Sequence, residues 1–198
     1  MLGWTVWLLG SFAINVSIDR QPFATPATIR WVLMSALMGM MLAWPAVRLS
    51  QRAPQRSTAA TLCDLFILMS LLQLVIWPAR VVPVDWSIAK VAVMDYAFLV
   101  YGLITAMIID HGRRCGGVGR AVALGAAVGW AICGLVLPSD APAWARVLLS
   151  PIQTIYRLSM PNPVEAVEPM GGVLSVMGLA LVVVWVLTLR LRGRRQMA

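Results

Sequence analysis

Histidine is almost missing from this chain, since the 198 residues include one imidazole, that of His111. A bis-histidine haem site and a histidine-rich zinc site both need more imidazoles than the sequence holds. Carboxylates paired at the spacing of a glycosidase are not evident either. We therefore expect no enzymatic activity, no cofactor and no metal site.

Charged residues are also scarce. Asp, Glu, Lys and Arg make up 12% of the chain, and Lys90 is its single lysine. Apolar residues reach 60% with a mean hydropathy of +0.82, whereas soluble domains hold about 45–50% apolar residues. This excess predicts that lipid, rather than water, surrounds much of the folded chain.

The apolar residues fall into long runs separated by polar gaps. Each run holds about 17–23 residues, enough for a helix to cross ~30 Å of hydrocarbon at 1.5 Å per residue. The first run lacks a basic leader and a small-x-small cleavage site, so we expect a retained span. We predict one all-α, polytopic domain over residues 1–198, with six transmembrane helices at about 1–17, 30–48, 57–78, 88–110, 118–137 and 171–189.

Ten of the 16 basic residues occupy every second gap, whereas the other gaps hold five of the 8 acids and are nearly neutral. Basic residues near span ends stay on the cytoplasmic side. We therefore predict a plasma (inner) membrane protein with both termini in the cytoplasm. Nucleic acid is not an expected partner, because the basic residues are divided among loops instead of forming one patch. The ten residues are Arg48, Arg52, Arg56, Arg113, Arg114, Arg120, Arg190, Arg192, Arg194 and Arg195.

The three cysteines are Cys63, Cys115 and Cys133. The predicted topology places Cys63 and Cys133 within spans and Cys115 in the cytoplasm, so no disulfide is expected. His111 is predicted at the inner face and Cys133 near the outer face. A cysteine–histidine nucleophile pair is therefore not expected.

The gap between the fifth and sixth predicted spans is the longest, and its segment 142–160 has an amphipathic pattern. Ser150 is a suitable N-cap and Pro151 a suitable first helical residue. We predict two short helices, at about 142–149 and 151–160, that lie in the outer interface of the bilayer or dip into it. The alternative is a surface loop that rests on lipid.

Two aspartates, Asp64 and Asp95, lie within predicted spans. Each costs at least ~2.5 kcal/mol on insertion scales, so both should face the bundle or water. They form a polar or ion pathway, or else they have structural partners. The structural alternative, which we favour, pairs Asp64 with Thr61 or a neighbouring helix and Asp95 with Lys90 or a tyrosine. Asp110 and His111 are expected to be interfacial residues instead of a site.

The fifth predicted span carries small residues at every fourth position. Such residues share one helix face and let a second backbone approach closely. The partner helix could belong to this chain or to a second copy. This small-residue ladder consists of Gly117, Ala121, Gly125, Gly129 and Cys133.

Six spans, cytoplasmic termini and a short helix pair around Leu148–Tyr156 together resemble the membrane subunits of ABC-2-type exporters. The resemblance implies a transport subunit that works with a separate ATPase, since the chain has no Walker motif. It also implies that the ATPase docks on the loop after the second span, at Arg52 and Arg56.

Two other functions remain open from the sequence. The ladder and the lack of catalytic groups fit a non-catalytic structural or assembly subunit of a larger membrane complex equally well. A small proton-coupled carrier is the third possibility, and it requires Asp64 or Asp95 for coupling. Lipid and further protein subunits are the expected partners in each case.

Overall fold

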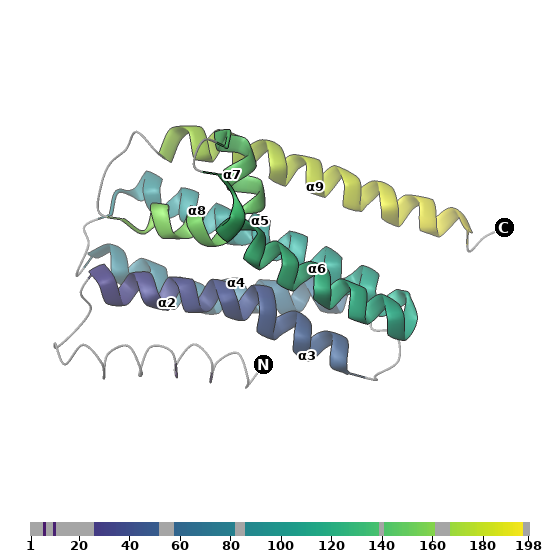
Figure 1. Cartoon of the computed structure of the whole chain (residues 1–198). Helices are drawn as coiled ribbons and strands as arrows, with labels where there is room; N and C mark the ends of the chain where they lie inside the picture. The colour runs from purple at the N-terminus through teal and green to yellow at the C-terminus, as the bar shows by residue number, and fades with distance from the viewer. Residues whose placement is uncertain are drawn as a thin grey trace.

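A computed structural model describes residues 6, 10, 26–51, 58–81, 86–138, 141–160 and 167–195. Within these residues the chain is all helical and has no strand (Figure 1). The predicted first span, residues 1–17, falls outside them apart from the two isolated positions. The predicted all-α class is therefore confirmed for the described part of the chain.

Four predicted spans coincide with helices that are long and apolar enough to cross a membrane. These helical stretches are Ala27–Ser50, Thr58–Trp77, Ile88–Arg114 and Gly116–Cys133. The last predicted span lies in α9, Val167–Arg195, whose apolar part runs over Met170–Val186. The chain thus has the character of a membrane protein, and the count of six spans stays a prediction.

The first of these stretches combines three helical segments: α2 (Pro26–Met38), the π-helix η1 (Gly39–Ala43) and α3 (Trp44–Ser50). Pro45 lies in the first turn of α3. A proline ring clashes with the preceding helical turn and lacks an N–H. The wider π turn immediately before Pro45, in which the Trp44 N–H reaches the Gly39 carbonyl, lets the helix continue past it.

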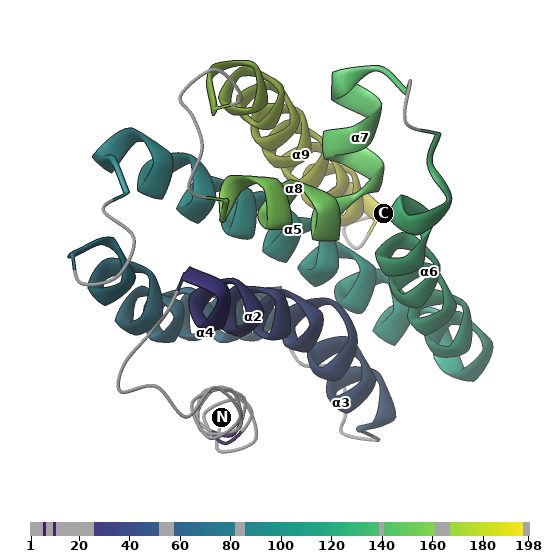
Figure 2. The ribbon, with the colours of Figure 1, turned by 60° about the vertical axis from the view of Figure 1, so that its left-hand side comes forward.

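Helix α5 (Ile88–Arg114) forms the centre of the bundle, between α4 (Thr58–Val81), α6 (Gly116–Val136) and α9 (Figure 2). Its largest buried side chains are Tyr101, Phe98, Met94 and Ile109. In contrast, α4 exposes Phe66 (73%) and Leu74 (71%), as expected of a helix that faces lipid.

Helices α5 and α6 form an antiparallel hairpin with a very short turn. Gly116 has a φ of +74° directly after Cys115, a conformation that glycine adopts without strain. The two backbones also come close together at Gly112. A Cβ at this position would overlap the Ala123 Cβ and lie 3.1 Å from Leu49 Cδ2. The hairpin therefore depends on glycine at both positions.

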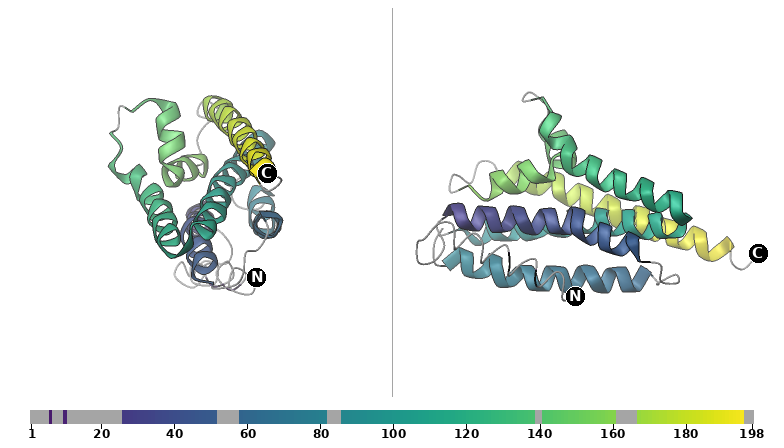
Figure 3. Two further views of the ribbon diagram at one scale, coloured as in Figure 1. Left: turned by 90° about the vertical axis from the view of Figure 1, so that its right-hand side faces the viewer. Right: turned by 60° about the horizontal axis from the view of Figure 1, so that its bottom comes forward.

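The segment between α6 and α9 forms two short helices, α7 (Ala143–Leu149) and α8 (Pro151–Leu158). Ser150 is at the N-cap position of α8, but its hydroxyl makes no capping hydrogen bond, unlike the cap that the sequence suggested. Ile155 and Leu158 are buried against the bundle, and α8 packs on α2, α5 and α6 (Figures 1 and 3). A surface loop is therefore not what this segment forms, and its position in the outer interface stays a prediction.

Gly112 provides a test of the hairpin. We expect Gly112→Ala to lower the free energy of unfolding by about 1–3 kcal/mol, because the added methyl overpacks the contact with Ala123. Thermal unfolding of the purified chain in detergent measures this as a fall in Tm. In the control variant, Gly172→Ala, the new methyl meets no atom within 4 Å. Helix propensity then keeps its Tm level or raises it, and equal Tm values for the two variants would contradict the hairpin contact.

Candidate functional site

Asp64 on α4 forms an ion pair with Arg48 on α3. The two side chains are 13% and 12% exposed, respectively, and Arg48 also donates to Gln51 Oε1 at 3.2 Å. Arg48 was predicted among the inner-loop arginines, and Asp64 was predicted to pair with Thr61 or a neighbouring helix. The partner lies on a neighbouring helix, and it is a charged residue that the gap pattern concealed.

Asp95 on α5 accepts a hydrogen bond from Gln73 Nε2 on α4 at 3.1 Å. The expected pairing with Lys90 or a tyrosine was wrong. The Lys90 ammonium instead donates to the Met160 carbonyl and lies 5.5 Å from the Trp86 ring centroid. Within the described residues, no hydrogen bond or ion pair joins Asp64 to Asp95. The two carboxylates therefore form separate local contacts instead of one relay.

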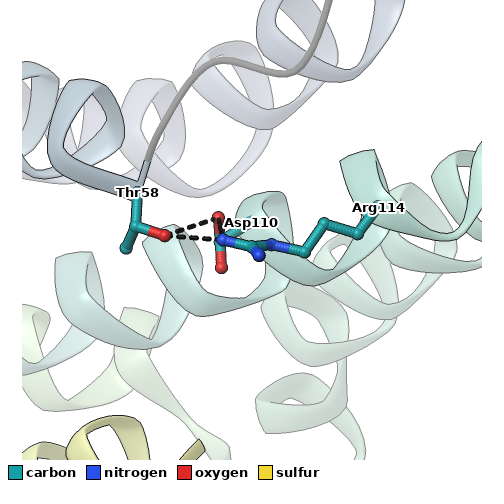
Figure 4. A network of polar contacts seen from close by, with 3 residues as sticks. All are labelled: Thr58, Asp110 and Arg114. Carbon is teal, nitrogen blue, oxygen red and sulfur yellow. Dashed lines mark hydrogen bonds and ion pairs between the residues drawn. The ribbon is translucent and has the colours of Figure 1, made fainter. Parts of the chain in front are cut away.

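A third carboxylate, Asp110, is the centre of a polar network at the predicted inner end of α5 (Figure 4). Its Oδ1 accepts from Thr58 Oγ1 at 3.2 Å and from Arg114 Nη2 at 2.9 Å, and Arg114 Nη2 is also 2.6 Å from Thr58 Oγ1. The Asp110 side chain is only 8% exposed. The network ties the first residue of α4 to the last turn of α5.

Sequence reasoning missed this network because it treated Asp110 as an interfacial residue. The spacing of Asp110 and Arg114 was a usable signal, since opposite charges four residues apart meet on one helix face. The contact with Thr58 had no such signal, because it joins positions 52 residues apart.

The small-residue ladder lies on the open side of α6. Gly117, Ala121, Gly125 and Gly129 are all exposed, and a Cβ at any of the three glycines meets nothing within 4 Å among the described atoms outside its own helix. The described helices of this chain therefore do not cover the ladder. The buried face of α6 consists of different small residues, Ala123, Ala127 and Ala131.

A cavity of about 520 Å³ lies between α5, α6 and α9. Its walls are mostly apolar, and Asp110, His111 and Cys115 are its polar lining residues. His111 Nε2 lies 3.6 Å from Cys115 Sγ. The prediction considered His111 only against Cys133, and the structure shows that the neighbour of His111 is Cys115.

No protein-family model, curated protein or solved structure matches this chain.

Two further points concern the predicted docking residues and metal binding. Arg52 and Arg56, the predicted docking residues, fall outside the described part of the chain. Among the described residues, no three His, Cys, Asp or Glu side chains are grouped closely enough to hold a metal ion.

The contribution of the Arg48–Asp64 ion pair to stability can be tested by replacing its residues. We expect Asp64→Asn to lower stability by about 3–5 kcal/mol, because it leaves a mostly buried guanidinium without its anion. The double variant Arg48→Met with Asp64→Leu should recover most of the lost Tm, since an apolar pair needs no charge compensation. Thermal unfolding in one detergent compares the three chains. A double variant no more stable than Asp64→Asn would show that the aspartate has a role beyond this pair.

Proposed function

We propose that this chain is a non-catalytic membrane subunit that joins a larger complex through the open face of α6. The observation that carries the proposal is the pair of opposite small-residue faces on this helix. One face packs inside the chain, and the ladder face is left open.

The buried face of α6 shows how closely a second helix can approach a row of small residues. Ala123 on α6 lies against Gly112 on α5 so closely that no Cβ fits between them. Positions two apart on a helix point about 200° apart, so the ladder lies nearly opposite this contact. The ladder has the same four-residue spacing of small side chains, and it therefore suits a second close backbone approach.

The residues beside the ladder strengthen this interpretation. Among the described side chains, the large apolar ones that α6 exposes are all β-branched, whereas α4 exposes two leucines, Leu62 and Leu74, and a phenylalanine, Phe66. A β-branched side chain in a helix has essentially one rotamer and loses little entropy when another helix packs on it. These residues are Val118, Val122, Val128, Ile132 and Val136.

The intramembrane carboxylates also favour a structural role over a proton-coupled carrier. Arg48 engages Asp64 and Gln73 engages Asp95, both within the chain. A carboxylate that holds two helices together is costly to use in a proton relay, because its protonation would break the contact.

The ladder predicts the outcome of a disruption. Gly125→Leu combined with Gly129→Leu should release the chain from its complex, because two leucines keep the partner backbone at a distance. Size analysis and co-purification after mild extraction from native membranes measure the release. A matched control, Gly172→Leu with Ala180→Leu, adds the same side chains at exposed positions of α9 and should leave the complex intact. Wild-type chain recovered as a free monomer would refute the proposal.

Transport is a second candidate, and the α7–α8 pair favours it. The two short helices return against the bundle between α6 and α9. Tyr101 and Trp130 hold α7 by donating to the Val147 and Leu148 carbonyls at 2.8 and 2.9 Å, respectively. An ABC-2-type exporter subunit has a helix pair at this place in the chain. In this proposal the chain lies in the plasma membrane, and six spans place both termini on the cytoplasmic side. A separate ATPase docks on the loop between α3 and α4.

The docking loop gives the transport proposal its test. Arg52→Glu with Arg56→Glu should abolish nucleotide-dependent transport and leave membrane insertion intact, since charge reversal repels the docking surface of the ATPase. Insertion is checked by membrane fractionation, and ATPase association by co-purification under mild extraction. Absence of any ATPase subunit from the wild-type preparation would refute transport and would leave the assembly proposal standing.

A further inference from the structure

The cavity between α5, α6 and α9 has the form of a groove with one polar end. From Cys115 to Ala126, its lining residues on α6 follow one side of the helix for about 16 Å at 1.5 Å per residue. Ile104 and Met107 of α5 and Leu181 and Trp185 of α9 line the rest. Its polar lining residues, Asp110, His111 and Cys115, are near the turn between α5 and α6.

The polar end of the groove brings a thiol close to an imidazole. Cys115 is free and exposed, and its Sγ lies 3.6 Å from His111 Nε2. Gly119 makes room for this side chain, because a Cβ there would overlap the Cβ of Cys115. Cys63 and Cys133 are equally free and exposed, but the single histidine of the chain contacts Cys115.

The neighbouring carboxylate, that of Asp110, accepts from Thr58 and Arg114. The imidazole of His111 contacts Cys115, four residues further along the chain. The predicted topology places this end of α5 in the cytoplasm, where activated fatty acids are found as thioesters. A juxtamembrane cysteine in that position is a typical site of S-acylation.

We propose that Cys115 is an S-acylation site that takes a long-chain acyl group from a fatty-acyl thioester and lays the chain in this groove. The Cys115 proton passes to His111 Nε2 as Sγ attacks the carbonyl carbon of the donor. The new S–C bond forms, the C–S bond of the donor breaks, and the proton returns to the departing thiolate. The products are a thioester on Cys115 and a free thiol, with no change in oxidation state.

The apolar groove is the reason why we expect a long-chain acyl group at Cys115. Its lining beyond the polar end is formed by apolar residues, and burial of each methylene of the acyl group removes apolar surface from water. A short acyl group buries fewer methylenes against these residues than a long one. Attachment through Cys115 therefore sets the depth at which the chain enters the groove.

The test uses the full chain in lipid nanodiscs and an alkyne derivative of palmitoyl-CoA. We expect hydroxylamine-sensitive labelling, confirmed by intact mass, on wild-type protein and on Cys63→Ser and Cys133→Ser. Cys115→Ser should lose at least tenfold of the label. Labelling of Cys115→Ser at the wild-type level, or no labelling of the wild type, would overturn the proposal.

Two further variants separate the roles of the base and the groove. His111→Asn should slow labelling about tenfold or more, because the general base is lost. Ala126→Phe fills the groove and should reduce labelling by the palmitoyl probe, but not by acetyl-CoA and not alkylation by iodoacetamide. Equal rates for wild type and both variants would show that Cys115 reacts only as an exposed thiol and would refute the site.

Discussion

The need to satisfy polar groups inside an apolar medium governs the arrangement of the bundle. Four polar side chains of the central helix α5 each reach a different part of the chain. Lys90 binds the Met160 carbonyl after α8, and Asp95 binds Gln73 of α4. Tyr101 binds the Val147 carbonyl of α7, and Asp110 binds Thr58 at the start of α4. Since an unpaired polar group in lipid costs several kcal/mol, these contacts fix where α4, α7 and α8 lie around α5.

How far the sequence predicts the fold follows from the same constraint. Span positions are readable because length and hydropathy depend on local composition, and Thr58–Trp77 differs little from the predicted 57–78. Partners between helices are not local. The prediction paired Asp95 with Lys90 or a tyrosine, yet its partner is Gln73, across the helix interface. A single sequence carries no signal for this choice among polar side chains.

The candidate site also has features that the sequence predicts and features that depend on packing. The ladder on α6 was predictable as a face, because four-residue spacing defines a face on any helix. Whether that face turns inward or outward depends on packing, and the second set of small residues at Ala123, Ala127 and Ala131 takes the inner position. The His111–Cys115 contact was overlooked for another reason: its partners are four residues apart on one helical turn, and Cys133 was considered in place of Cys115.

Helix α6 carries both proposed contacts with the surroundings, and their geometry lets them coexist. Ala126 lines the groove, and at 100° per residue the ladder residues Gly117, Ala121 and Gly125 point about 180°, 140° and 100° away from it. An acyl chain in the groove would therefore lie beside α9 and leave this part of the ladder open. The acyl chain would occupy the space between α6 and α9. It would therefore hold α6 at a fixed position against α5 while the ladder receives a partner helix. Acylation in the groove and assembly on Gly117, Ala121 and Gly125 would then use different sides of the same helix.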